Sequence, residues 1–169
     1  MKRHSLQSSA GFSLVEMLFY ISLLVLVSTV CVAVLLSFKD NIASYQASQR
    51  VTNSAVTTLE RLLVDVRAAE AVNVGASTLT TNPGTLVLTD GATTTTYSVS
   101  DGAVSISVNG ATVGPLTDAT VVVDELRFFH YVNAETETVR VQLTLSATAG
   151  GMTVTERFGS SAVLLGSYD

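Results

Sequence analysis

An uninterrupted apolar run at residues 17–38 constrains this chain more than any other feature. The run contains no glycine, no proline and no charged residue, so a continuous helix is expected. At 1.5 Å per residue, 22 residues give a helix of about 33 Å. A hydrocarbon core is roughly 30 Å thick, and the sequence therefore predicts a membrane-spanning helix near the N-terminus.

The residues before the run predict its orientation. Lys2 and Arg3 precede it, and the positive-inside rule then places the N-terminus in the cytoplasm and the rest of the chain outside. A secretory signal peptide has a shorter apolar stretch and a cleavage site of small residues after it, which this run does not match. A plain membrane anchor stays open as an interpretation, although it leaves Glu16 unexplained, because a carboxylate within a membrane span is costly. Glu16 reaching the lipid headgroups is a second alternative.

The residues GFSLVE at positions 11–16, with a basic leader before them and the long apolar helix after them, resemble the type IV pilin and pseudopilin family. In that family a prepilin peptidase cuts after the glycine and methylates the new terminal amine. The resemblance implies cleavage between Gly11 and Phe12 and an N-methylated Phe12. It also implies that the helix serves first as a membrane anchor and then as part of a filament core.

The same resemblance implies a role for Glu16. In a dry core of packed helices, an isolated ammonium at Phe12 and an isolated carboxylate at Glu16 are both costly. If Glu16 of one subunit meets the Phe12 amine of a neighbour, both costs are offset, but only in the assembled register. Glu16 is therefore expected to form an intersubunit salt bridge.

The remainder of the chain predicts an α+β fold. Residues 39–73 are expected to continue the helix as an amphipathic segment that ends before Gly75. Its apolar positions are Ile42, Tyr45, Val56, Leu59, Leu62, Leu63, Val66 and Ala69. From Leu79 onward apolar residues alternate with polar ones, and Asn-Pro-Gly, Asp-Gly, Asn-Gly and Gly-Gly turns separate the segments. We expect an antiparallel sheet of about five to eight strands packed on the second half of the helix, with residues 120–132 as a central strand.

These patterns divide the chain into a leader peptide at 1–11, a membrane-spanning and filament-core helix at 12–38, an amphipathic helix at 39–73 and a β-rich head at 74–169. Two features depart from many major pilins. Cys31 is the one cysteine, so no disulfide can close a C-terminal loop, and no glycine or proline interrupts residues 12–38. Both departures favour a minor pilin or a minor pseudopilin.

The sequence contains few residues that could carry out catalysis. The histidines are His4 and His130, and no set of ligands has the spacing of a metal site or a phosphate-binding loop. We expect no enzymatic activity, no cofactor and no metal, and a structural role for His130. The net charge is −5, or −7 without Lys2 and Arg3, so nucleic acid is not an expected partner.

The sequence thus leads to a functional hypothesis. The chain is expected to be a structural subunit of a type IV pilus-like filament, held in the cytoplasmic membrane with its head outside before it joins an extracytoplasmic filament. The resemblance implies the prepilin peptidase, other pilin or pseudopilin subunits and the lipid bilayer as partners. Pili, type II secretion and DNA uptake all use such subunits, and the choice among them stays open. The alternative is a single-pass anchored module that binds a ligand or an envelope protein and does not polymerise.

Overall fold

The computed structural model of the chain describes residues 13–133 and 136–165. The chain divides into two compact units, Met1–Asn41 and Ile42–Asp169. Helix α1 (Leu14–Ala68) is 55 residues long and contributes residues to both units.

Helix α1 ends five residues earlier than the sequence predicted. The last helical turn closes with Ala69 N donating to Asp65 O at 3.0 Å. The backbone N–H groups of Glu70 and Asn73 then bond to carbonyls of strand β2 (Leu86–Asp90) instead of to the preceding helical turn. The extension of the helix to Asn73 was therefore wrong, because these donors find their partners in a sheet.

Within the described residues eight strands follow the helix, and all their pairings are antiparallel. A five-stranded sheet has the order β1-β2-β3-β4-β5, and a three-stranded sheet has the order β6-β7-β8. Besides β2, the strands are β1 (Ala71–Val72), β3 (Thr93–Ser100), β4 (Ala103–Val108), β5 (Ala111–Pro115), β6 (Val121–Val132), β7 (Glu137–Ala149) and β8 (Met152–Val163). The α+β prediction is confirmed, although the strands form two sheets and not one.

Tight turns close the hairpins where the sequence placed them. The β3–β4, β4–β5 and β7–β8 hairpins each turn on two residues with positive φ: Asp101-Gly102, Asn109-Gly110 and Gly150-Gly151. Positive φ at both positions matches the right-handed twist of the paired strands. In the β2–β3 hairpin the loop is Gly91-Ala92, with Gly91 alone at positive φ.

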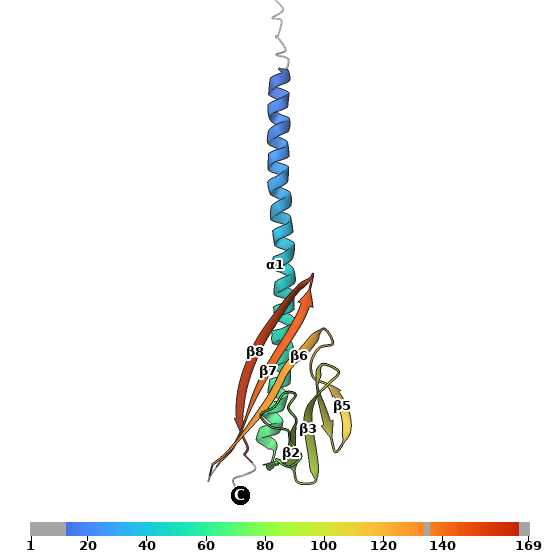
Figure 1. The fold of residues 1–169 in the computed structure, drawn as a ribbon, viewed down its shortest axis with the longest axis vertical. Helices are drawn as coiled ribbons and strands as arrows, with labels where there is room; N and C mark the ends of the chain where they lie inside the picture. The colour runs from blue at the N-terminus through green and yellow to red at the C-terminus, as the bar shows by residue number, and fades with distance from the viewer. Residues whose placement is uncertain (1–12, 134–135, 166–169) are drawn as a thin grey trace, which may run out of the picture. The chain divides into compact units, whose positions relative to one another are not determined.

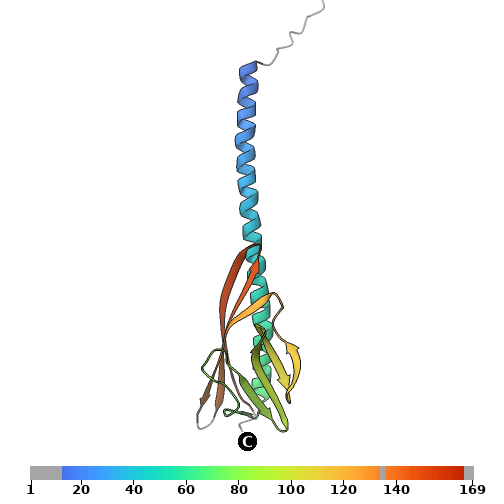
Figure 2. The same cartoon turned by 45° about the vertical axis from the view of Figure 1, so that its right-hand side comes forward.

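Both sheets of the second unit share one hydrophobic core with the helix residues of that unit (Figures 1 and 2). The buried helix residues recur at steps of three, four or seven: Ala47, Val51, Ser54, Ala55, Thr58, Leu62 and Val66. The sequence predicted Ile42, Tyr45 and Val56 on this face, and that was wrong, because they are 55%, 66% and 46% exposed. The buried face instead contains small residues such as Ala47 beside large ones such as Leu62.

Strand β6 lies at the edge of its sheet, which corrects the prediction of a central strand. The segment at residues 80–84 covers part of that edge. Gly84 N donates to Leu126 O at 2.8 Å, and Leu126 N donates to the side-chain oxygen of Asn82 at 3.0 Å. A Cβ on Gly84 would lie 3.0 Å from Leu126 O and 3.1 Å from a ring carbon of Phe128. The Asn82-Pro83-Gly84 turn therefore serves to pair with β6, which explains why this apolar edge strand is not left open.

Candidate functional site

The apolar part of α1 is the first candidate site. From Leu14 to Phe38 every side chain is exposed. The helix is long and apolar enough to cross a membrane, with a mean hydropathy of 2.7 over its most apolar window. An exposed apolar surface of this kind requires lipid or other apolar helices around it.

Two hydroxyl groups within this segment are satisfied by the helix itself. Ser22 Oγ donates to Phe19 O, and Thr29 Oγ1 donates to Val25 O, both at 2.8 Å. Such bonds to the preceding helical turn allow a hydroxyl to reside in an apolar medium without a further partner. These two side chains therefore need no hydrogen-bond partner from a neighbouring chain.

Glu16 differs from these hydroxyl groups. It lies in the first turn of α1 and is exposed, and its carboxylate makes no ion pair or hydrogen bond with any residue of 13–133 or 136–165. The N-terminal end of a helix favours a negative charge by roughly 0.3–1 kcal/mol. That is small beside the cost of a carboxylate in hydrocarbon. Gly11 and Phe12, the predicted cleavage site and modified terminus, lie outside the described residues.

His130 is the one histidine in the described part of the chain. Its Nε2 lies 3.2 Å from Glu137 Oε2, and its side chain is only 9% exposed. Its cross-strand neighbour on β7 is Val139, which is fully buried, so the imidazole lies on the core side of the sheet. The described residues contain no group of three or more His, Cys, Asp or Glu side chains that could hold a metal ion. His130 with Glu137 therefore forms a pair at the border of the core.

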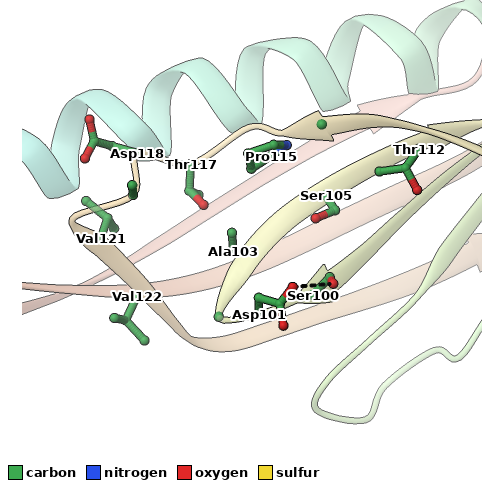
Figure 3. A pocket seen from close by; sticks show the side chains of 13 residues that line it. Ser100, Asp101, Ala103, Ser105, Thr112, Pro115, Thr117, Asp118, Val121 and Val122 are labelled. Carbon is green, nitrogen blue, oxygen red and sulfur yellow. Dashed lines mark hydrogen bonds between the residues drawn. The ribbon is translucent and has the colours of Figure 1, made fainter.

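A hollow of about 430 Å³ lies in the second unit between the β3–β4 turn and the link from β5 to β6. Figure 3 shows Asp101 at the turn, with Thr117 and Asp118 on the link. Thr117 Oγ1 accepts a hydrogen bond from Val104 N at 3.2 Å. Hydrogen bonds from the side chain and the backbone of Thr120 hold the pKa of Asp118 below its usual range.

The chemistry of the hollow is that of an acidic, hydroxyl-lined surface without a nucleophile and base pair. Its carboxylates, Asp101 and Asp118, make no ion pair within 4.0 Å in the part of the chain that the structure describes. The sequence pattern predicted Asp101 as a turn residue, and nothing in it pointed to Asp118. The two residues are 17 positions apart, and only the folding of β4 and β5 between them brings both to one hollow.

No family model, curated protein or solved structure matches the chain.

Proposed function

We propose that the chain is a structural subunit, a minor pilin or a minor pseudopilin, of a type IV pilus-like filament. The observation that carries the proposal is Glu16: a carboxylate without a partner among the described residues, in the first turn of an exposed apolar helix. The helix satisfies Ser22 and Thr29 internally. Glu16 is the charged residue of the segment at 14–38, and its carboxylate is a group that another molecule has to satisfy.

The proposed life of the subunit has two stages. Before assembly the apolar segment is held in the cytoplasmic membrane, with Lys2 and Arg3 on the cytoplasmic side and the head outside. The prepilin peptidase removes residues 1–11 and methylates Phe12. During assembly the helices leave the bilayer and pack against one another, and Glu16 meets the Phe12 amine of a neighbour. A buried pair of this kind selects the register more than it adds stability.

The alternative is a membrane-anchored binding module that does not polymerise. In that case α1 serves only as an anchor, and Glu16 stays at the membrane surface, where the helix dipole and the headgroups accommodate it. The two proposals differ in what removal of the carboxylate does.

Substitution of Glu16 by alanine tests the proposal. The variant should remain in the membrane and be processed, because its helix is more apolar than before. It should be lost from the sheared filament fraction by about tenfold or more, since the removal of one partner leaves a buried charge uncompensated. Glu60→Ala is the matched control, because Glu60 is an exposed glutamate of the same helix outside the apolar segment. Equal incorporation of both variants would favour the anchored binding module.

A further inference from the structure

The outer face of the three-stranded sheet, the side away from the core, carries three arginines. Alternate residues of β7 are fully buried against the core: Val139, Val141, Leu143 and Leu145. Successive side chains of a strand point to opposite sides, so Arg140, Gln142 and Thr144 lie on the outer side. Arg127 of β6 pairs across to Gln142, and Arg157 of β8 pairs across to Thr144. The three arginines therefore occupy three successive rows, one on each strand.

One carboxylate serves this group of arginines. Glu125 Oε1 lies 2.7 Å from Arg127 Nε, and Glu125 Oε2 lies 3.0 Å from Arg157 Nη2. The first contact is an ion pair without an aligned hydrogen bond. Arg140 is exposed and has no ion pair within the described residues. Two of the three guanidinium groups thus share one carboxylate and the third has none among the described residues, so the face keeps a positive charge.

Two aromatic side chains complete this surface. Phe129 lies directly opposite Arg140 across the β6–β7 pair, and Tyr131 lies one row further and is 51% exposed. Arginine and aromatic residues are the types enriched at protein interfaces and at their energetic centres. We call the surface formed by Arg127, Phe129, Tyr131, Arg140 and Arg157 the arginine face.

The rest of the second unit has the opposite charge. From Ile42 onward the sequence has six arginines, no lysine and twelve Asp and Glu residues. Without the arginine face and Glu125, three arginines and eleven acidic residues remain. Asp101 and Asp118 are exposed, lie together in the hollow beside β4 and make no ion pair among the described residues. The unit therefore presents a positively charged sheet face and, elsewhere, a hollow that contains two carboxylates.

We propose that the arginine face docks on the hollow that contains Asp101 and Asp118 in a second copy of this chain. The proposal rests on the proposed filament, because a contact between two different surfaces of identical subunits is heterologous, and such a contact builds an open helical filament when its rotation does not close a ring. The charge complementarity of the two surfaces favours this occupant. A polyanion such as nucleic acid is disfavoured, because the surrounding surface of the unit would repel it.

A photo-crosslinking amino acid at Ser161 tests the docking in the full-length chain in its membrane. Ser161 is exposed and pairs with Arg140 across β7 and β8, so the probe reports on the arginine face without removing any arginine. We expect a crosslinked dimer whose second peptide comes from residues 101–120.

Arg140→Glu should lower the yield of this dimer about fivefold or more, since close charge pairs across an interface contribute strongly. Adding Asp101→Arg to the same chain should restore it, and Arg67→Glu, an equal change in net charge at another exposed arginine, should not lower it.

Three results would overturn the docking proposal. They are the absence of a crosslinked dimer, a dimer whose yield does not depend on Arg140, and a crosslink to nucleic acid or to another protein that is lost on Arg140→Glu. The N-terminal mass and the sheared filament fraction are measured in the same samples. Processed, polymerised chain without the crosslink contradicts only the docking, whereas an unprocessed chain with an Arg140-dependent dimer contradicts only the filament.

Discussion

The phenol of Tyr97 donates a hydrogen bond of 2.5 Å to Oδ2 of Asp65, and this contact ties the five-stranded sheet to helix α1. Tyr97 is fully buried on β3, and Asp65 also pairs with Arg61 Nε at 3.2 Å. Burial is the main cause that raises the pKa of Tyr97 above its usual value of 10.0, and the hydrogen bond to Asp65 adds to it. The folded unit therefore requires the neutral phenol.

Tyr97→Phe should lower the free energy of unfolding of the second unit by about 1.5–3 kcal/mol at pH 8, because a hydrogen bond to a charged group is lost. Since the folded pKa lies above the unfolded one, the phenol contributes fully below pH 10.0, and its contribution falls as the pH rises further. The difference between the native chain and the variant should shrink above pH 10.0. Urea unfolding in detergent micelles, followed by circular dichroism, measures both effects. Tyr131→Phe, at an exposed tyrosine, is the control, and a difference that grows with pH would refute the assignment.

Gly150→Ala should be more destabilising than Gly91→Ala. The φ angle is 57° at Gly150 and 56° at Gly91, and each glycine directly follows the last residue of a β strand. A Cβ at Gly91 meets nothing within 4 Å, whereas a Cβ at Gly150 would lie 2.8 Å from the Cβ of Ala43 on α1. Backbone strain should cost each variant about 1–2 kcal/mol, and overpacking should add about 1–3 kcal/mol at Gly150 alone. Hydrogen exchange of the β7 and β8 amides measures the difference, and equal protection in the two variants would show that the close approach to Ala43 is unimportant.

Local chemistry explains which parts of this fold the sequence predicted. The hairpin turns depend on two adjacent residues, so Asn109-Gly110 and Gly150-Gly151 identified them without any tertiary information. The α+β class followed from the change in apolar period along the chain. The end of α1 depends on Glu70 and Asn73 bonding to β2, a long-range contact that no local pattern contains.

The prediction of the buried face of the helix was partly wrong for a related reason. Apolar side chains at Ile42 and Val56 suggested the core, but the helix buries Ala47 and Ala55 instead, whose small side chains give a weak apolar signal. The candidate sites also divide into one that depends on local sequence and one that depends on long-range contacts. Glu16 was identified because it lies beside an apolar run. The arginine face depends on strand register and could not be predicted from the sequence, although Arg127 and Arg140 alternate with apolar residues in their strands.

Asn82→Ala should destabilise the edge of the sheet at strand β6. Asn82 accepts from Leu126 N at 3.0 Å and donates to Asp124 O at 3.3 Å, next to the bulge between Val123 and Glu125. Loss of the side chain should leave Leu126 N without its partner and lower the free energy of unfolding by about 1–3 kcal/mol. Faster exchange of the Leu126 amide reports on the loss directly. Asn53→Ala, at an exposed asparagine of α1, is the control, and unchanged protection of Leu126 would contradict this role.

The mass of the mature N-terminal peptide tests the central proposal most directly. Intact mass spectrometry of the chain isolated from membranes should give a polypeptide of residues 12–169 with one added methyl group on the Phe12 amine. Gly11→Ala should block the cut and leave residues 1–169 joined. A native chain that keeps residues 1–11, or a Gly11→Ala chain that is processed as before, would contradict the account.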